Sequence, residues 1–590
     1  MTELKPKSNT IQETLLALDN CTRLGARFVR RSGEATFYPY SEVIARAKSV
    51  AGALQASGLE PGDRVAIILP TSIEFFDVFL GTQLAGGIPA ALYPPFFLGK
   101  LNDYFARTRK MLSRIGARFL VTEARIKAIL GPASSGVESL KKVLEAKSLL
   151  TSDPWTPVAV DPETPAFLQF SSGSTSEPKA VVVSQLNLLY NLEMMDTVFQ
   201  TFTEADPEKG AVCWIPLYHD MGLVGFMFNG LYHPATVTYI GPEVFIASPA
   251  VWLKTMSKYK AQASAAPHFA YGYCVARIKD EEMQGVDLSN WLLALNGAEP
   301  VEAEGMRKFT ERFRKWGFRP AAMTPGYGLA EAGLAVSFSD PHSEPLVTEF
   351  DRDELSAERR AVEGKGRKLA SLGHPMPGLE VAIWDERDSP LAGGAAGKIM
   401  VRGPSVSPGY FNDAETTRQT IRNGWLDTGD LGFFHGGDLY IAGRAKDLII
   451  IRGRNYAPQE IEELAAQAAG VRPGWVVAVS QSIDEDSGEQ LLVLAERDAR
   501  SKIPEDEIAA EIRQKVVAGI GLTPYHVQIL DPDTLPRTSS GKLRRSDALR
   551  MFLAGELAPA EKMGAFKLLR EIGKSQVAWG RFWLRTRSGE

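Results

Sequence analysis

Residues 170–179 read FSSGSTSEPK and are the most informative stretch of the chain. Apolar runs precede them at residues 166–170 and follow them at residues 180–183, so we predict a loop between two strands. The N–H groups, hydroxyls and lysine of such a loop can bind phosphate oxygens. It is not a Walker A loop, because its lysine lies between Pro178 and Ala180 rather than in a Gly-Lys-Ser/Thr helix start. Alone, it is equally compatible with an ordinary polar connection.

The composition narrows the class of protein. The chain has 590 residues, 44% hydrophobic and 23% charged, which is typical of a globular protein of roughly two to four folding units. A net charge of −5 argues against nucleic-acid binding driven by bulk charge. Three widely spaced cysteines form neither a metal pattern nor a disulfide framework, which favours a reducing, cytoplasmic location. With a polar start and no uncharged apolar run of ~18 residues, we expect neither a signal peptide nor stable membrane insertion.

Strand and helix signals alternate through most of the chain, which predicts an α/β fold with largely parallel sheets. Residues 1–30 resemble a helical lead-in, and residues 40–59 have helical periodicity. The further predicted elements are strands at 65–69, 119–121 and 211–215 and helices at 73–84 and 184–195.

The pattern changes near residues 346–370, which are charged, rich in Arg and Glu and poor in strand signals. Beyond them we predict a small β-rich subdomain and then a compact α/β unit. We therefore predict two domains, 1–445 and 446–590, and expect the tail from about residue 561 to form a docked helix. The elements on which this division rests are strands at 381–384, 398–402, 475–479 and 491–495, a helix that opens at Pro458, and a helix at 504–517.

Six further segments carry residues suited to nucleotide chemistry. Taken singly, each has an ordinary explanation, such as a capped turn, a core aromatic or a solvated lysine. Together they supply phosphate donors, a ring for stacking, carboxylates for ribose and metal, and cations for developing charge. The segments are WIPLYHDMGL (214–223), NGAEP (296–300), YGLAE (327–331), WLDTGD (425–430), GRAKD (443–447, continuing to RGRN at 452–455) and PRTSSGK (536–542).

In order and spacing, the seven segments resemble those of the adenylate-forming superfamily of acyl ligases, from about residue 10 to about residue 550. Members of that superfamily activate a carboxylate with ATP, giving an acyl-adenylate and pyrophosphate, and a carrier thiol usually accepts the acyl group. The resemblance implies a large N-terminal domain of α/β subdomains with a small β-rich subdomain, hinged to a small α/β C-terminal domain.

The resemblance also implies which residues bind ATP and Mg²⁺. Glu331 would hold Mg²⁺ with Thr175 nearby, and the metal would neutralise phosphate charge as pyrophosphate leaves. The usual phosphate loop has Gly where this chain has Ser176 and Ala180, and Ser tolerates a positive φ less well than Gly. The phosphate-binding residues would be Ser171, Ser172, Gly173, Ser174, Thr175 and Lys179, and the adenine site would comprise Tyr327 for stacking, with Gly297, Ala298, Gly328, Leu329 and Ala330.

The remaining implied roles concern ribose and catalysis. Asp430 and Arg444 would bind the ribose hydroxyls. Lys542, on the small domain, would approach the carboxylate and the α-phosphate, where it stabilises charge shared in the transition state. Lys446 would be the hinge about which the small domain rotates. A general base is not required, because the attacking carboxylate is already ionised at neutral pH.

The resemblance places His219 at the mouth of the acyl pocket, and we count it with Lys542 and Glu331 as catalytic. Several nearby aromatic and apolar residues could line a tunnel, although each is equally compatible with an ordinary core position. Collectively they favour a fatty acid over an amino acid, for whose amine Asp220 is the only local acidic partner. The candidate tunnel residues are Phe226, Met227, Phe228, Phe269 and Tyr271.

Four details are more similar to fatty acyl-AMP ligases than to acyl-CoA ligases: residues 93–95, 214–223, 448–459 and the charged segment 344–372. In fatty acyl-AMP ligases, an insertion at the place of segment 344–372 is thought to restrain the small domain and disfavour the CoA-using pose. The alternative for this segment is a solvated surface loop.

Three hypotheses follow. The first is a fatty acyl-AMP ligase that passes its acyl group to the phosphopantetheine arm of an acyl carrier protein. The second is a long-chain fatty acyl-CoA ligase. The third is a non-catalytic, nucleotide-binding regulatory protein, against which the intact Lys542, Glu331 and Asp430 argue.

Overall fold

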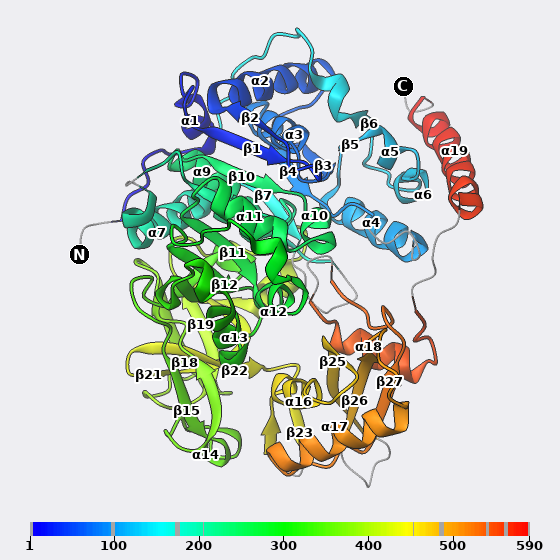
Figure 1. The fold of residues 1–590 in the computed structure, drawn as a ribbon. Coiled ribbons are helices and arrows are strands. Elements are labelled where there is room, and N and C mark those ends of the chain that lie inside the picture. The colour runs from blue at the N-terminus through cyan, green and yellow to red at the C-terminus, as the bar shows by residue number, and fades with distance from the viewer. Residues whose placement is uncertain are drawn as a thin grey trace.

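The computed structural model describes residues 4–95, 101–170, 178–203, 206–451, 454–482, 489–538, 542–559 and 565–587. A large N-terminal part carries two extended sheets, and a smaller α/β unit lies against it (Figure 1). This arrangement confirms the predicted α/β fold class. The 445/446 domain boundary itself stays a prediction.

A six-stranded sheet forms the first subdomain and is parallel except at β8. The helix predicted at 73–84 coincides with α3 (Ile73–Leu84), which is buried on almost every side, as its apolar sequence requires. The strands predicted on either side of the phosphate loop are confirmed as β7 and β8, whereas residues 171–177 lie outside the described residues. In spatial order the strands are β6 (Lys142–Glu145), β5 (Phe119–Thr122), β3 (Arg64–Ile68), β4 (Ile88–Ala91), β7 (Pro165–Phe170) and β8 (Ala180–Ser184), with α2 (Tyr40–Ala56) and α4 (Leu101–Ile115) in the same subdomain.

A nine-stranded sheet forms the second subdomain. Its central strands are parallel, so their carboxyl ends share one edge, which is where ligands bind in α/β sheets. Of the described residues up to position 30, only those of the short α1 (Ile11–Leu16) are helical, and the predicted helical lead-in was wrong beyond it because Gly25–Val29 forms β1 of this sheet. The order is β17 (His374–Pro375), β14 (Ala335–Phe338), β13 (Met323–Gly328), β12 (Leu293–Gly297), β11 (Ala263–Pro267), β9 (Ala211–Cys213), β10 (Val237–Ile240), β1 (Gly25–Val29) and β2 (Ala35–Pro39).

Helices cover both faces of this sheet and connect its parallel strands (Figure 1). A π-helical turn at Leu223–Phe228 leads into the single-turn α9 (Asn229–Tyr232). The longer helices are α7 (Gln185–Thr203), α10 (Pro242–Ala247), α11 (Ala250–Lys258), α12 (His268–Arg277) and α13 (Ala303–Phe313).

The segment at 346–370, predicted to be poor in strands, forms the ribbon β15 (Val347–Asp351) and β16 (Gly366–Ala370), with α14 (Arg352–Ser356) between them. Phe350 is fully buried, and its ring packs 4.9 Å from that of Phe433, between centroids. The strands therefore depend on tertiary packing that composition does not reveal. The ribbon packs on a five-stranded sheet of β18 (Glu380–Trp384), β19 (Gly397–Arg402), β20 (Ile421–Arg422), β21 (Trp425–His435) and β22 (Asp438–Arg444).

The small unit has its own core, in which Ile461, Val493 and Ile512 are fully buried. The strands predicted at 475–479 and 491–495 lie within β25 and β26, as expected. Its elements are β23 (Ile449–Ile451), β24 (Arg454–Tyr456), α16 (Pro458–Ala465), β25 (Val471–Ser482), β26 (Glu489–Arg497), α17 (Glu505–Ile520), β27 (His526–Leu530) and α18 (Arg545–Leu553).

The C-terminal helix α19 (Ala565–Arg587) is docked, as predicted, but it docks on the N-terminal part rather than on the small unit (Figure 1). Phe582 is 2% exposed in the core of the six-stranded sheet. The Ser575 hydroxyl accepts a 2.9 Å hydrogen bond from Gly131 N, and Trp579 Nε1 donates to the Lys127 carbonyl at 3.1 Å. Within the described ranges, every helix is too short or too polar to cross a membrane.

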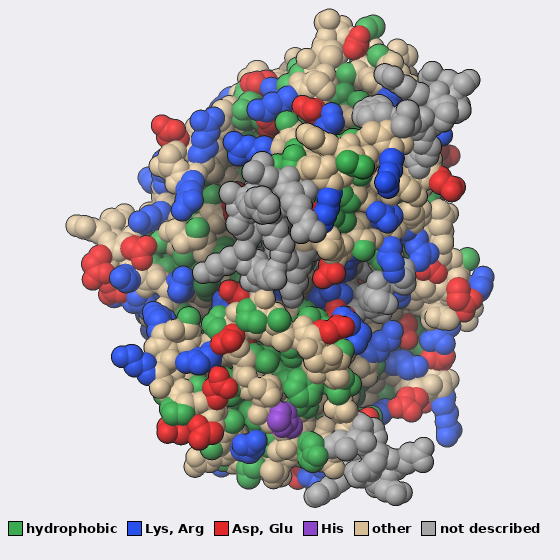
Figure 2. Space-filling model, turned by 90° about the vertical axis from the view of Figure 1, so that its right-hand side faces the viewer, with side chains coloured by type: hydrophobic (Ala, Val, Ile, Leu, Met, Phe, Trp, Pro, Cys, Tyr) green, Lys and Arg blue, Asp and Glu red, His purple; other side chains and the backbone are tan. Residues whose placement is uncertain are grey.

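Figure 2 shows the face that carries α4, α18 and α19, on the right of Figure 1. Lys and Arg side chains gather on this face around the junction of the two parts. Helix α4, which belongs to this face, carries Arg107, Arg109, Lys110 and Arg114 in its sequence. The positive charge is therefore concentrated locally although the chain as a whole is slightly acidic.

Candidate active site

A cleft of about 2780 Å³ lies between the N-terminal part and the small unit and continues into the N-terminal part. Every described residue of the predicted site lines this cleft. Ser171, Ser172, Gly173, Ser174, Thr175 and Ser176 lie outside the described residues. The lining residues predicted from sequence are Lys179, His219, Gly297, Ala298, Tyr327, Gly328, Leu329, Ala330, Glu331, Asp430, Arg444, Lys446 and Lys542.

Tyr327, Asp430 and Arg444 form one hydrogen-bonded group. The Tyr327 hydroxyl donates to Asp430 Oδ2 at 2.8 Å, and Arg444 Nε donates to Asp430 Oδ1 at 2.9 Å. Strand pairing explains the second contact, because Asp430 and Arg444 are cross-strand partners on β21 and β22. Burial and the Asp430 carboxylate raise the pKa of Tyr327 far above its ordinary value, so its hydroxyl keeps its proton. The Asp430 carboxylate retains lone pairs that can accept further hydroxyl donors.

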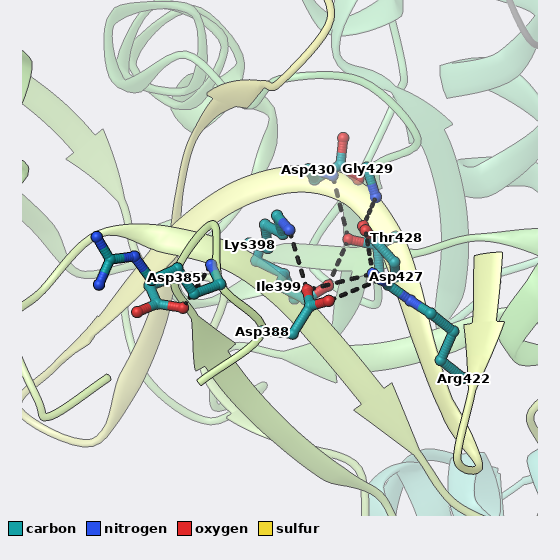
Figure 3. A network of polar contacts seen from close by, with 10 residues as sticks. Asp385, Asp388, Lys398, Ile399, Arg422, Asp427, Thr428, Gly429 and Asp430 are labelled. Carbon is teal, nitrogen blue, oxygen red and sulfur yellow. Dashed lines mark hydrogen bonds and ion pairs between the residues drawn. The ribbon is translucent and has the colours of Figure 1, made fainter. Parts of the chain in front are cut away.

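The residues before Asp430 are held by side chains of β21 and by a backbone carbonyl of the neighbouring β19 (Figure 3). Thr428 Oγ1 donates to the Ile399 carbonyl at 2.9 Å and accepts from Asp430 N at 3.2 Å. Gly429 N donates to Asp427 Oδ1 at 2.9 Å, and Gly429 adopts a φ of 73°, where glycine is favoured. The bend in this strand therefore directs the Asp430 carboxylate into the cleft, and the sequence WLDTGD supplies each residue that the bend requires.

The ends of β12 and β13 approach each other closely beside Tyr327. A Cβ on Gly297 would lie 2.7 Å from the Gly326 carbonyl oxygen, so only glycine fits there. Ala298 follows with a φ of 62°, a left-handed conformation that costs energy for a residue with a side chain. Strained backbone of this kind clusters at functional sites, and here it exposes backbone groups to the cleft.

Glu331 and Lys179 approach a common aromatic residue that sequence reasoning missed. Tyr410 donates a 2.9 Å hydrogen bond to Glu331 Oε1, and Lys179 Nζ lies 5.4 Å from the centroid of the Tyr410 ring. Burial is the main cause of a raised Glu331 pKa. The Tyr410 contact orients the carboxylate and leaves Oε2 for another ligand. The signal for Tyr410 was weak, because it lies in the SPGYF stretch, outside the seven segments.

The donor set fits Mg²⁺ bound together with a phosphate ligand. The described residues contain no cluster of three or more His, Cys, Asp or Glu side chains able to hold a metal by themselves. Mg²⁺ commonly takes one or two protein carboxylates, several waters and substrate phosphate oxygens. Glu331 supplies one such carboxylate at the cleft wall.

His219 and Asp220 form a close pair at the start of the channel. The Asp220 pKa is about 2, since the effect of burial, which raises it, is exceeded by the charges of His219 and Lys542 and by hydrogen bonding. Asp220 Oδ1 lies 2.6 Å from His219 Nδ1 and accepts from Met221 N at 2.8 Å. The 2.6 Å contact with an ionised carboxylate favours a proton on Nδ1 over the longer 3.3 Å approach of Met221 N, and it leaves the other ring nitrogen of His219 for a ligand.

Lys542 reaches the cleft from the small unit. Thr538 N donates to the Lys542 carbonyl at 2.8 Å, and Lys542 N donates to Thr538 Oγ1 at 3.0 Å. Burial lowers the Lys542 pKa, while Asp220, Glu299 and Asp430 oppose that shift. These three carboxylates all belong to the N-terminal part. The small unit is therefore closed over the cleft, with its lysine among the acidic residues of the opposite wall.

Glu299 is a second residue whose importance was not predicted. Its Oε1 accepts a 2.5 Å hydrogen bond from Phe269 N. Burial raises its pKa, and Lys542, Arg537 and Arg545 of the small unit lower it. Three cations of the small unit thus act on one carboxylate of the N-terminal part. Glu299 lies within the quoted NGAEP segment, but its partners are over 230 positions away, so sequence alone could not identify them.

The predicted insertion contacts the small unit directly through α14. Arg352 Nε donates to Glu460 Oε1 at 2.7 Å, and its Nη1 donates to the Gly519 carbonyl at 2.8 Å. Arg454 Nη1 pairs with Asp353 Oδ1 at 2.9 Å, and Asn455 Nδ2 donates to the Ser356 carbonyl at 3.0 Å. The segment is thus in contact with α16, the end of α17 and β24, and is not merely a solvated loop.

From His219 the cleft continues as a channel along the nine-stranded sheet. Of the predicted tunnel residues, Phe226 and Phe269 line it. Met227, Phe228 and Tyr271 are at most 1% exposed in the core and do not line it. For these three residues the core alternative holds, because the π-helical turn and α12 direct these side chains away from the channel. The channel walls are instead formed by Ala211, Val237, Ala263, Ala265, Leu293, Leu295, Phe338, Met195 and Phe199.

The cleft has at one end the Tyr327–Asp430–Arg444 group, which is suited to bind a nucleotide, and at the other end an apolar channel. Together with the fold, this cleft defines an adenylate-forming enzyme. Residues 21–411 match the family described as AMP-binding enzyme. A long-chain-fatty-acid–AMP ligase, FadD26 of Mycobacterium marinum, is 32% identical over 88% of this chain and 92% of its own length. A medium-chain-fatty-acid–[acyl-carrier-protein] ligase, JamA of Moorena producens, is 31% identical over 89% and 91%.

A solved structure from a study of fatty acyl-adenylate ligases from E. coli and L. pneumophila superposes with a TM-score of 0.87. It is 32% identical and covers 93% of this chain and 98% of its own. The chain therefore belongs to the AMP-binding enzyme family, in the group of the fatty acyl-AMP ligases.

Proposed function

We propose that this protein activates a fatty acid with ATP to form an acyl-adenylate and pyrophosphate, and then passes the acyl group to the phosphopantetheine thiol of an acyl carrier protein, which forms a thioester and releases AMP. One observation carries the proposal. A single cleft joins the Tyr327–Asp430–Arg444 group to an apolar channel, and Lys542 of the closed small unit lies among the acidic residues between them.

In the first step, a carboxylate oxygen of the fatty acid attacks the α-phosphorus of ATP, a new O–P bond forms, and the bond to the departing pyrophosphate breaks. Tyr327 stacks on adenine between the backbone of Gly297 and Ala298, and Asp430 and Arg444 bind the ribose. Lys179, the hydroxyls of the Ser and Thr residues at 171, 172, 174 and 175, and the backbone N–H groups of this loop bind the β- and γ-phosphates. Lys542 stabilises the negative charge that develops between the carboxylate and the α-phosphate.

Glu331 and Thr175 would hold Mg²⁺, which when bound supplies charge neutralisation on the phosphates. His219, held by Asp220 at 2.6 Å, would orient the carboxylate end of the substrate at the channel mouth. An amino-acid substrate is disfavoured, because Asp220 is already engaged by His219 and Met221 N.

The preference for a carrier protein over CoA rests on two observations. JamA, whose name states an acyl-carrier-protein ligase, matches along nearly its whole length. In addition, α14 of the predicted insertion binds α16 and α17 of the small unit, which stabilises the closed pose over the CoA-using pose. The three cysteines are free thiols, which supports the proposed cytoplasmic location.

The deciding experiment follows products by mass spectrometry after the purified protein is mixed with ATP, Mg²⁺ and fatty acids of several lengths. We expect acyl-adenylate and pyrophosphate, acyl transfer on addition of a phosphopantetheinylated carrier protein, and little product on addition of CoA. Abundant acyl-CoA would instead establish the long-chain acyl-CoA ligase hypothesis. Nucleotide binding without any adenylate would favour the non-catalytic regulatory protein.

A further inference from the structure

At its far end the channel reaches α9, where two buried polar atoms face it. Asn229 and His233 both line the channel. Asn229 Oδ1 and His233 Nε2 are buried, and among the described residues neither atom has a hydrogen-bond partner. Buried polar atoms in folded proteins are nearly always paired, so two unpaired atoms at one place indicate a missing ligand group. The His233 side chain is only 9% exposed, so bulk solvent does not readily supply that group.

The contacts of His233 establish which of its nitrogens carries a proton. Burial, followed by the charge of Lys7, lowers the His233 pKa to about 3, so the ring is neutral near pH 7. Its Nδ1 lies 2.7 Å from Lys7 Nζ and 3.2 Å from Asp196 Oδ1. An ammonium group can only donate, so Nδ1 accepts from Lys7 and the proton is on Nε2. The Leu192 carbonyl raises the His233 pKa and so partly opposes the effect of burial, while Nε2 is without a hydrogen-bond partner among the described residues.

The two side chains are positioned to bind one group together. His233 N donates to the Asn229 carbonyl at 2.9 Å, so the two residues are one helical turn apart. Side chains separated by four positions lie on the same side of a helical turn. A hydrogen-bond donor, His233 Nε2–H, and an acceptor, Asn229 Oδ1, therefore lie one turn apart on the same stretch of the channel lining.

The charges and the walls around this pair narrow the ligand class. Lys7 Nζ lies 3.7 Å from Asp196 Oδ2, so the nearby charges are opposite and paired, and they do not favour a second carboxylate. Between the pair and His219, the walls are apolar, with Ala263, Leu293 and Phe338 among them. The complementary group is thus neutral, is both donor and acceptor, and is carried at the end of an apolar chain. A hydroxyl satisfies both atoms, a ketone satisfies only His233, and a methyl group satisfies neither.

We propose, on the basis of the function proposed above, that the channel selects fatty acids with a hydroxyl group at or near the end distal to the carboxylate. That hydroxyl accepts a hydrogen bond from His233 Nε2–H and donates one to Asn229 Oδ1. Asn229 and His233 are then residues that determine substrate specificity and take no part in adenylation chemistry.

The test compares lauric, myristic and palmitic acids with their ω-hydroxy analogues. Pyrophosphate release gives kcat/KM for each acid. At the chain length that fits the channel, we expect the hydroxy acid to be preferred about 10-fold or more, because a site built to bind a hydroxyl leaves polar atoms unpaired when it is missing. In His233→Phe and in Asn229→Leu the preference falls to near unity, mainly through a higher KM for the hydroxy acid. In His233→Gln, which keeps a donor, part of the preference returns.

Phe199→Leu is the matched channel control and should change the rates for both acids while keeping their ratio. Thermal melting checks that each variant folds. The proposal is overturned if the wild-type protein does not prefer the hydroxy acid at any length, or if the preference persists in both His233→Phe and Asn229→Leu. Activity with plain fatty acids and no preference contradicts only this inference, whereas no activity with any acid contradicts the proposed function.

Discussion

The Tyr327 hydroxyl donates a 2.8 Å hydrogen bond to Oδ2 of Asp430, a residue 103 positions later in the chain. This bond joins the end of β13 in the nine-stranded sheet to β21 in the β-rich subdomain. Arg444 engages the other carboxylate oxygen, so the ring proposed to stack on adenine and the carboxylate proposed to bind ribose are held as one rigid group. Such rigidity lowers the entropic cost of binding the nucleotide.

Asp430→Asn should raise the KM for ATP at least about 10-fold, because the amide removes an ionised acceptor worth roughly 1.5–3 kcal/mol and leaves Arg444 without its carboxylate. Tyr327→Phe keeps the ring and loses only one neutral hydrogen bond, so kcat/KM should fall less than about 10-fold. Steady-state pyrophosphate release at varied ATP measures both. A larger loss in Tyr327→Phe than in Asp430→Asn would contradict the assigned roles.

Lys542→Ala should lower the rate of adenylate formation by about 10²–10³, the range found when one group that stabilises transition-state charge is removed. ATP binding, measured by the thermal shift it causes, should remain largely intact, because nucleotide contacts come from the N-terminal part. The control is Lys502→Ala, an exposed lysine on the same unit. An unchanged rate in Lys542→Ala would remove this lysine from the mechanism.

Arg352→Ala should loosen the closed pose, because it removes both the Glu460 contact and the Gly519 contact between α14 and the small unit. We expect acyl-CoA formation from added CoA to rise several-fold, as the population shifts by about 1–2 kcal/mol away from closure. Arg359→Ala is the matched control. Arg359 lies on the same inserted segment as Arg352, but it pairs with Glu386 and not with a residue of the small unit. Equal CoA use in the two variants would count against restraint by the insertion.

Closure should weaken as pH rises, because of Glu302 on the N-terminal wall and Glu463 on α16. Burial, followed by mutual repulsion with other carboxylates, raises the Glu302 pKa, and burial also raises the Glu463 pKa. A carboxyl group whose pKa is higher in the closed state stabilises that state while it is protonated. This contribution is full below the ordinary carboxyl pKa and is lost as pH rises through the raised values. The other charged groups that act on the pair are Glu299, Lys308, Arg367, Glu460 and Glu462.

Glu302→Gln should therefore flatten the alkaline side of the pH profile of single-turnover adenylate formation, because the amide cannot ionise. Glu304→Gln provides the comparison, since Glu304 lies at the surface in an ion pair with Arg307. If the wild-type and Glu302→Gln profiles coincide between neutral and alkaline pH, the carboxylate pair does not control closure.

The sequence predicted the parts of this protein whose signals are local. The apolar helix α3, the strands β7 and β8, and the order of the nucleotide-binding segments follow from short patterns, because propensity and turn chemistry act between neighbouring residues. The residues proposed to bind ATP could therefore be predicted from the short sequence segments that contain them. Their grouping around one cleft was implied by a resemblance, and the structure brings the described members together.

What the sequence alone determined is the α/β class, the chemistry carried by each segment and the order in which the segments occur. Tertiary structure decided which side chains meet. It buried Phe350 and so made strands of a segment that reads as charged loop, and it placed Phe226 in the channel but Phe228 in the core. It also set His233 beside Lys7, 226 positions away. The physical reason is that burial, side-chain direction and long-range pairing depend on how distant elements pack, and no local pattern encodes that packing.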